Sequence, residues 1–459
     1  MKVKIGLEVH LYVKLENNKT KLFCSCPINY KETSPNTNIC PRCTGMPGNK
    51  PMLPNKEAFE KAIEVALILN CGIPKGYILF QRKHYDWPDL PNGFQKTISG
   101  TYSVPVGYEG KYHNVRISYM HLEEDPAKWD PITGYVDYNR SGIPLIEIVT
   151  EPDLIDSEET RTWVRNLMTA LSYVNSIDKD LGIKADVNVN IENHPRVEIK
   201  NVNSLANIKK AIEYEVLRQQ KALLSGKNLV QETRTYDDKQ DITIHMRYKE
   251  QAQDYMFIPE PDLPSIQVTK DQLERIRKIV PESPESKRER FVNKHKLKKE
   301  DAETLSSNLK LAEIFEAIIK ESDINVTAKL LVRDLLSVLN YDKLEIENVN
   351  LNLENLKYLS KILAENKITE NTSKKILIEL VKKDFSVKDY IKKHDLEIKS
   401  DKSELEAICK QVIKENPQAV KDYESGEEKA LNFLVGMVMK KTKGTANPDI
   451  VNNIIKKLL

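Results

Sequence analysis

The sequence lacks the features of secreted, membrane-spanning and disulfide-rich proteins. It contains no run of about 20 apolar residues that could cross a membrane. Residues 1–6 lead directly into a strand-like segment, with no apolar stretch of the kind a secretory signal requires. Six cysteines in 459 residues are too few for a disulfide scaffold. We therefore expect a cytoplasmic protein without a membrane partner.

Common catalytic motifs are also missing. The chain has no Walker A motif and no Gly-x-Gly-x-x-Gly motif, so a bound nucleotide would be held by something other than a glycine-rich loop. No serine or cysteine nucleophile motif is present either. Lys and Arg total 70 against 68 Asp and Glu, and a net charge of +2 does not identify a partner.

The length and the 40% hydrophobic content predict about three domains with packed cores. Up to residue 290, strand-like and helix-like periodicities alternate. The alternating strands have one open face, which predicts an α+β domain with a largely antiparallel sheet. The expected strands and helices of this part are Ile5–His10, Val115–Tyr119, Met120–Asp125, Asp186–Ile191, Val197–Lys200, Ile242–Arg247, Lys56–Leu69, Glu158–Val174 and Ile208–Leu224.

The second part of the sequence is helical only. The segment Pro281–Arg290 is rich in charge, Ser and Pro, and is either a linker or the start of a new unit. We expect a helical domain at 291–397 and a small helical tail domain at 398–459. The expected helices are Leu309–Lys320, Thr327–Leu339, Leu353–Leu363, Ser373–Val381 and Glu404–Glu415.

Acidic residues recur on the strand-like segments of the first part. Glu8 and His10 share one strand face, Glu123 and Glu124 end another segment, and Glu147 interrupts an apolar run. An ionised Glu is costly to bury unless a cation or a hydrogen-bond donor meets it. Each residue alone could be the solvated face of a sheet, but the set predicts a site for a hard divalent ion such as magnesium.

Four of the six cysteines fall within twenty residues as a C-x-C pair and a C-x-x-C pair. Pairs at this spacing let two turns supply four thiolates to one ion, which is typical of a closed, structural zinc site. The alternative is four unrelated reduced thiols. The predicted zinc ligands are Cys24, Cys26, Cys40 and Cys43, whereas Cys71 and Cys409 are isolated packing residues.

Several charged and aromatic residues are candidates for binding phosphate or RNA, and each has a simpler alternative. Arg82 and Lys83 could neutralise phosphate oxygens and Tyr85 or Trp87 could stack on a base, unless this loop-like stretch is only a solvated turn. Asp186 and Lys200 belong to a polar strand face that suits a charged substrate or simply faces water. Tail lysines could contact RNA phosphates or cover a solvated helix face; they are Lys440, Lys441 and Lys443.

Six segments distributed from residue 5 to the tail resemble the B subunit of the tRNA-dependent amidotransferase family. The most specific of them is Pro144–Asp153. The six are Ile5–His10, His121–Asp125, Pro144–Asp153, Gln231–Arg234, Pro259–Pro264 and Gly444–Pro448.

This resemblance implies a kinase-like cradle domain at 1–290, with a zinc-binding loop at 24–43, and a tail that contacts tRNA. It also implies an enzyme that amidates misacylated Glu-tRNA(Gln) or Asp-tRNA(Asn). ATP phosphorylates the tRNA-linked carboxylate with magnesium, and ammonia from the glutaminase, the A subunit, displaces the phosphate. The C subunit is a further partner.

The resemblance also implies a ligand set for magnesium, and it selects Glu124 over Glu123. Arg82, Lys83 and Lys200 are the candidate cations that offset the repulsion between the reacting anions. Pro126, Met256 and Ile258 depart from the usual family pattern. The implied magnesium ligands are Glu8, His10, Glu124 and Glu147, with Asp186 in support.

Two other functions are compatible with the same residues. A non-catalytic tRNA-binding scaffold would use the zinc loop and the basic tail and would tolerate neutralised acids. A two-metal nuclease or phosphohydrolase would use clustered acids to cut RNA without ATP or glutamine. The acidic set argues against the scaffold, because a protein that only binds RNA gains nothing from a floor of carboxylates.

Overall fold

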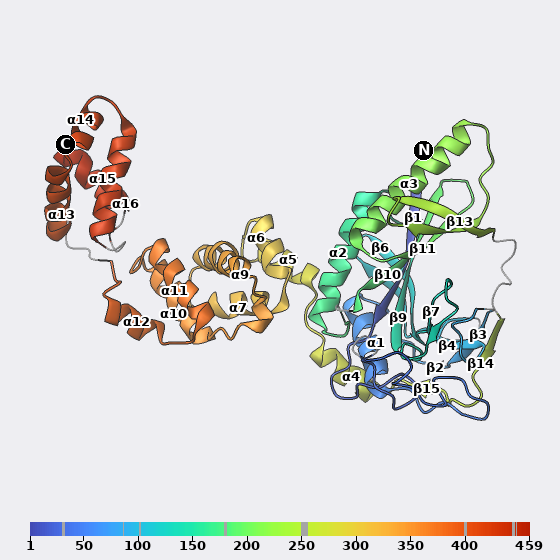
Figure 1. Ribbon diagram of the computed structural model, residues 1–459. Coiled ribbons are helices and arrows are strands. Elements are labelled where there is room, and N and C mark those ends of the chain that lie inside the picture. The colour runs from blue at the N-terminus through green and yellow to red at the C-terminus, as the bar shows by residue number, and fades with distance from the viewer. Residues whose placement is uncertain are drawn as a thin grey trace. The chain divides into compact units, whose positions relative to one another are not determined.

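The computed structural model describes residues 1–29, 33–85, 87–100, 102–178, 181–248, 256–398, 402–442, 446 and 448–459. Within these ranges the chain divides into two compact units, Met1–Ser283 and Pro284–Leu459. The first combines a sheet with helices and the second is helical (Figure 1), which confirms the predicted α+β class.

Most strands of the first unit belong to one large sheet. In chain order the strands of the unit are β1 (Val3–Tyr12), β2 (Tyr77–Ile78), β3 (Gln81–His84), β4 (Phe94–Thr97), β5 (Gly107–Tyr112), β6 (Val115–Glu124), β7 (Lys128–Trp129), β8 (Val136–Asp137), β9 (Pro144–Thr150), β10 (Ile183–Ile191), β11 (Val197–Val202), β12 (Glu232–Asp237), β13 (Ile242–Tyr248), β14 (Met256–Pro259) and β15 (Ile266–Gln267).

Among the described residues this sheet has eleven strands in the order β13-β12-β11-β10-β1-β9-β6-β4-β3-β14, with β5 beside β6. The neighbours pair antiparallel except β11 and β12, which are parallel. The chain between those two strands passes through helix α3 (Leu205–Leu224), and a crossover helix is the usual way to join parallel neighbours. The prediction of a largely antiparallel sheet is confirmed.

Helices α1 (Lys56–Ile68), α2 (Ser157–Tyr173) and α3 lie along one side of the sheet (Figure 1). The fourth helix of the unit, α4 (Lys270–Ile279), contacts α1. On β1 the side chains of Ile5, Leu7 and Val9 are fully buried. Since side chains alternate along a strand, Glu8 and His10 must lie on the opposite face, which the helices leave open.

One segment expected to be a loop-like turn is a strand. Residues Gln81–His84 form β3, which pairs antiparallel with β4 on one side and β14 on the other. The sequence Gln-Arg-Lys-His has no apolar residue, so no hydrophobic alternation marks it as a strand. Its backbone is paired on both sides, and fully buried Gln81 donates from Nε2 to the carbonyl of Ser99 at 2.7 Å.

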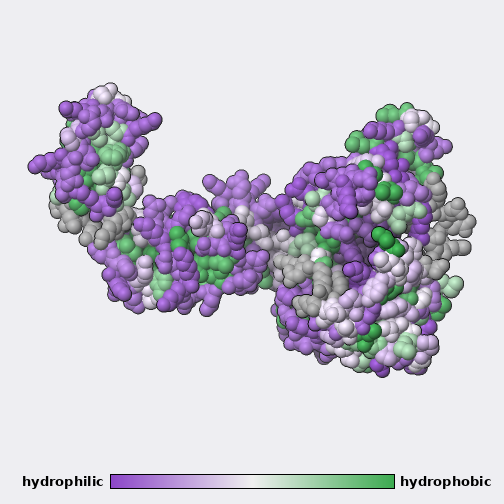
Figure 2. Space-filling model, viewed as in Figure 1, coloured by the Kyte–Doolittle hydropathy of each residue, from purple (hydrophilic) through white to green (hydrophobic). Residues whose placement is uncertain are grey.

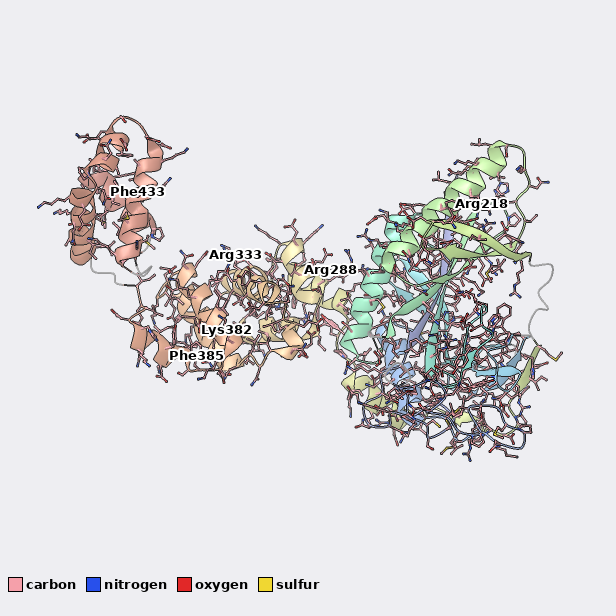
Figure 3. All side chains as sticks on the ribbon, in the orientation of Figure 1. Arg218, Arg288, Arg333, Lys382, Phe385 and Phe433 are labelled. Atoms are coloured by element: carbon pink, nitrogen blue, oxygen red, sulfur yellow. The ribbon has the colours of Figure 1, made fainter. Side chains whose placement is uncertain are left out.

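A buried ionic network joins α3 to β12 and β13. Arg218, which Figure 3 places on α3, pairs with the fully buried Glu215 at 2.7 Å and with Glu232 of β12 at 2.8 Å. Arg234 and His245 also contact Glu232, at 3.0 and 2.7 Å. Each carboxylate has cationic partners, so its charge is compensated. The ion pairs hold these strands in position against the helix.

The second unit begins with Pro284, which is the first residue of α5 (Pro284–Asn293). The segment Pro281–Arg290 therefore contains the start of a new unit. The domain boundary expected at residue 290 falls inside this helix. The second unit's helices are α5 (Pro284–Asn293), α6 (Lys299–Ser306), α7 (Leu309–Ile318), α8 (Ile324–Ala328), the π-helix η2 (Lys329–Leu335), α9 (Leu336–Tyr341), the 3-10 helix η3 (Ile346–Asn348), α10 (Leu353–Ala364), α11 (Glu370–Lys382), α12 (Val387–His394), α13 (Lys402–Glu415), α14 (Pro417–Glu424), α15 (Glu428–Lys441) and α16 (Pro448–Leu458).

This unit contains two separate hydrophobic clusters. One cluster extends from Phe291 to Ile391 and the other from Leu405 to Ile455. The described residues of this unit therefore form two separate hydrophobic cores. The visible surface of the unit is mostly hydrophilic, with apolar side chains in small patches (Figure 2). Within the described ranges, no helix combines the length and apolar character that a membrane span requires. The division of the helical part at residue 397 stays a prediction.

The apolar side chains on the buried face of β1 stabilise the sheet whose opposite face carries the acidic residues. A matched pair of substitutions tests how much this burial contributes to stability. Leu7→Ala removes a fully buried side chain and should lower the free energy of unfolding by about 2–5 kcal/mol. Leu217→Ala, the same change at a position 54% exposed on α3, should alter it by less than about 0.5 kcal/mol. Urea unfolding of the full chain measures both. Equal effects would contradict the assigned burial.

Candidate active site

A row of polar side chains crosses four neighbouring strands on the open face of the sheet. The register places His10 of β1 opposite Lys184 of β10 on one side and opposite Glu147 of β9 on the other. Glu147 in turn lies opposite His121 of β6. Residues from four distant parts of the sequence therefore meet in one line because of strand pairing alone.

Three residues of this region form a compact group that could hold a metal ion. One ligand atom each of His10, Glu123 and Glu147 lies within 4.8 Å of the others. His10 Nε2 is 3.5 Å from Glu147 Oε1. Among the described residues, the buried atoms Glu123 Oε2 and His121 Nδ1 have no hydrogen-bond partner. Buried polar atoms without partners are rare, and here they fit a bound cation with its water ligands.

The protonation of this group reflects its burial and its close charges. Burial opposes the charge on His10, but the hydrogen bond and charge of Glu147 raise the pKa of His10 to about 9. Burial opposes the charge on Glu147 too, yet its contact with His10 holds the pKa of Glu147 well below the usual range. Burial and the charge of Glu147 raise the pKa of Glu123 to about 7. A divalent ion would favour the ionised Glu123 and the neutral His10.

A second acidic group lies next to the first. Glu8, Asp186 and Glu198 have ligand atoms within 4.8 Å of one another. Lys200 Nζ is 2.6 Å from Asp186 Oδ2 and 2.9 Å from Glu198 Oε1. Burial, followed by the charge of Glu147, raises the pKa of Glu8. Lys200, proposed above as a cation for the substrate, is therefore engaged by two carboxylates of the protein.

The structure places one residue of the expected ligand set apart from the others. Glu124 lies on the other face of β6 and pairs with Lys96, whose Nζ is 2.7 Å from Glu124 Oε1. The backbone N–H of Lys96 also donates to the same oxygen at 2.9 Å. Adjacent strand residues point to opposite faces, so only Glu123 reaches the open face. The geometry therefore favours Glu123 over the predicted Glu124 beside Glu8, His10, Glu147 and Asp186, which are brought to one face.

The other expected substrate-binding residues are placed less uniformly. Arg82 makes a bidentate contact with buried Glu260, at 2.9 and 2.8 Å, so its guanidinium is not available to a phosphate. Lys83, the next residue of β3, has its side chain on the opposite face of the sheet from Arg82, and its charge adds to the larger effect of His10 that opposes burial and lowers the pKa of Glu147. Tyr85 is half-buried just after β3.

The four cysteines converge as predicted. The Sγ atoms of all four lie within 4.8 Å of one another. Lys21 Nζ is 3.4 Å from Cys43 Sγ, and the backbone N–H of Cys40 donates to the same sulfur at 3.2 Å. The hydrogen bond from Cys24, together with the charge of Lys21, outweighs burial and lowers the pKa of Cys43 to about 4. A thiolate supported in this way, with three thiols around it, could hold a metal ion.

The tail lysines have different environments. Lys440 is exposed at the end of α15, on the same helix as the exposed Phe433 that Figure 3 labels. Lys441 Nζ is 2.8 Å from Glu415 Oε1 and is therefore partly neutralised. Lys443 lies outside the described residues, as do Gly444, Thr445 and Asn447 of the expected tail motif.

Comparisons with known proteins agree with this arrangement. Residues 3–274 match a family described as the GatB/GatE catalytic domain, and residues 313–459 match one described as the GatB domain. A Methanobrevibacter smithii protein, named as the B subunit of aspartyl/glutamyl-tRNA(Asn/Gln) amidotransferase, is 43% identical over 453 residues, 98% of both chains. The chain belongs to this family of amidotransferase B subunits.

Further relatives support the same assignment. Proteins with the same name from Methanopyrus kandleri and Methanococcus maripaludis are 40% and 43% identical over 462 and 470 residues. Both alignments cover 100% of this chain and 98% of the relative. The resemblance inferred from six short segments is thus confirmed along the whole length.

The sequence contained signals for the residues that were missed. The alternation through β6 places Tyr119, His121 and Glu123 on one face, which would have selected Glu123 and added His121. Glu198 was visible as part of a polar strand face. Its approach to Glu8, however, depends on the pairing of β10 with both β1 and β11, which no local pattern reveals.

Two neighbouring glutamates provide a direct test of the corrected ligand set. Glu123→Gln removes a charged ligand oxygen and should lower Mg²⁺ affinity by about tenfold or more. Glu124→Gln should leave this affinity within about twofold, because its effect falls on the stability of the Lys96 pair instead. Titration calorimetry of the full chain measures both affinities. A larger loss in Glu124→Gln would show that the assignment is reversed.

The cysteine cluster predicts one tightly bound metal ion per chain. Cys43→Ser should abolish this metal content and lower the melting temperature, because the loop loses its cross-link. Cys71→Ser changes a buried cysteine outside the cluster and should retain the metal. Elemental analysis of the purified proteins measures the content. Full retention of metal by Cys43→Ser would show that the four thiols do not bind it together.

Proposed function

We propose that this chain is the component that activates and amidates misacylated tRNA in an ATP-dependent reaction. Its substrate is Glu-tRNA(Gln), Asp-tRNA(Asn) or both, and the product carries the amide. The names of relatives that match almost the entire chain support this substrate class. The acids grouped on the open face of the sheet support an activity, rather than tRNA binding alone.

The chemistry needs activation, because a carboxylate is a poor electrophile. In the proposed reaction a carboxylate oxygen of the tRNA-linked amino acid attacks the γ-phosphorus of ATP, and ADP leaves. Ammonia released from glutamine then forms the C–N bond, and phosphate leaves with the former carboxylate oxygen. The reaction converts ATP, ammonia and a carboxylate to ADP, phosphate and an amide, with positioning and charge compensation as the main tasks of the protein.

His10, Glu123 and Glu147 are the proposed protein ligands of magnesium, with Glu8 and Asp186 beside them. When bound there, the ion supplies positive charge that offsets the repulsion between the triphosphate and the carboxylate. Lys83 adds a cation from the β3 side of the group. The protein residues themselves would fix the position of the reacting oxygens, and the ion would displace the proton that Glu147 otherwise holds on His10.

The cysteine cluster is proposed to bind structural zinc. Four thiolates leave no coordination position open for a substrate, so such an ion cross-links the loop and does not take part in the reaction. The nearby Lys21 side chain, 1% exposed, offsets part of the negative charge of a four-thiolate site. This assignment accounts for a buried lysine beside four cysteines.

The proposed division of labour follows the three expected domains. Residues 1–283 form the catalytic cradle, residues 284–397 a helical domain, and residues 398–459 a tail that binds tRNA through Lys440 and Lys441. The glutaminase (the A subunit) and the C subunit complete the proposed complex. Its reaction would take place in the cytoplasm, where aminoacyl-tRNA is used.

The single observation that carries this proposal is the convergence of His10, Glu123 and Glu147, where the buried Glu123 Oε2 has no hydrogen-bond partner among the described residues. Glu147→Gln in the assembled complex should lower the rate of amidation by about 100-fold, because a charged ligand is lost. Glu192→Gln, at a half-exposed position paired with Lys4, is the matched control and should retain the rate. The amino acid recovered from the tRNA is the readout.

The same assay separates the rival functions. A scaffold would amidate at the normal rate after Glu147→Gln, and that result would contradict the proposal. A nuclease would shorten labelled tRNA in the presence of magnesium alone, without ATP or glutamine. We expect intact tRNA under those conditions.

A further inference from the structure

Lys184 occupies a central place on the open face that the proposed function does not explain. It lies on β10 directly opposite His10, in the row that continues through Glu147 to His121. It is two residues from Asp186 and therefore shares the same strand face. A cation in this position borders the first acidic group on the side away from Lys83.

Lys184 differs from the other cations near the site because it has no partner within the described part of the protein. Over those ranges its side chain makes no hydrogen bond and no ion pair, although it is partly buried. Lys200, Arg82 and Lys96, by contrast, each contact one or two carboxylates at 2.6–2.9 Å.

Asp125, an acid near this end of the row, is already engaged. Tyr12 Oη donates to Asp125 Oδ2 at 2.7 Å, and Arg140 Nε lies 3.4 Å from the same oxygen. The side chain of Lys184 therefore has no ion-pair partner among the described residues, and burial lowers the pKa of Lys184 although the charge of Asp125 opposes this shift. An ammonium group removed from part of its water is costly unless an anion meets it, so this position suits an external anion.

The surrounding charge also indicates what kind of ligand this is. Five carboxylates face the open side, those of Glu8, Glu123, Glu147, Asp186 and Glu198. Within the sheet, Lys200 neutralises only the group on the β11 side. An anionic substrate that approaches the His10 group needs a further positive charge, and Lys184 supplies it from the neighbouring strand.

We propose that the ammonium group of Lys184 binds an anionic oxygen of the reacting group, and that Lys184 is a substrate-binding residue. This inference rests on the proposed function, which supplies two sources of such an oxygen. One is the terminal phosphate of the nucleotide, and the other is the carboxylate carried by the tRNA. Both are recognised by the same donor chemistry.

The test uses the complete complex with Lys184→Met, which keeps the length of the side chain but removes its charge. The KM for ATP or for misacylated tRNA should rise by about tenfold or more, and Lys184→Arg should restore most of the loss. A higher KM for ATP identifies the phosphate, and a higher KM for the tRNA identifies the carboxylate. Lys4→Met, on the same face but paired with Glu192 and 47% exposed, is the control and should match the wild type.

A second readout separates substrate binding from a structural role. The Mg²⁺ affinity of Lys184→Met, measured by calorimetry without substrates, should stay equal to that of the wild type or increase, because a positive charge has been removed. Lys184→Gln replaces the Met variant if the latter unfolds. Both KM values and kcat within about twofold of the wild type would overturn the inference. A wild-type complex that makes no amide would instead overturn the proposed function itself.

Discussion

The pairing of β1 between β9 and β10 is the constraint on which the site depends. This register sets His10 opposite Glu147 on one side and Glu8 opposite Asp186 on the other. A slip of one residue would turn Glu8 and His10 into the helix-covered core and bring Leu7 and Val9 to the open face. Burial of the apolar side chains of β1 therefore sets the strand register, and this register determines where Glu8 and His10 lie on the opposite face.

Groups of neighbouring carboxylates repel one another, and the molecule compensates this negative charge to different extents in different places. Around Glu215 and Glu232, two arginines pair with the carboxylates. Around Glu8, a single lysine compensates part of the negative charge. Around Glu123, a buried oxygen is left without a partner among the described residues. The difference between carboxylates paired with arginines and a carboxylate with an unpaired buried oxygen distinguishes the first group from the acids proposed to meet a cation.

The sequence allowed only part of the site to be predicted. Glu8 and His10 were found because strand alternation is a local pattern, and the cysteines because their spacing is. The choice between Glu123 and Glu124 was harder, because two consecutive glutamates end a strand and only the folded sheet shows which one shares a face with Glu147. The strand β3 was missed because its four polar residues are held by backbone pairing to β4 and β14, which leaves no trace in hydrophobic periodicity.

The proposed metal site makes the account directly testable by crystallography. Crystals of the complex grown with Mn²⁺ and a non-hydrolysable ATP analogue would locate the ion through its anomalous scattering. The account predicts an ion bound by His10, Glu123 and Glu147, with the terminal phosphate beside it. An ion held by Glu124, or a nucleotide bound away from the open face of the sheet, would contradict it.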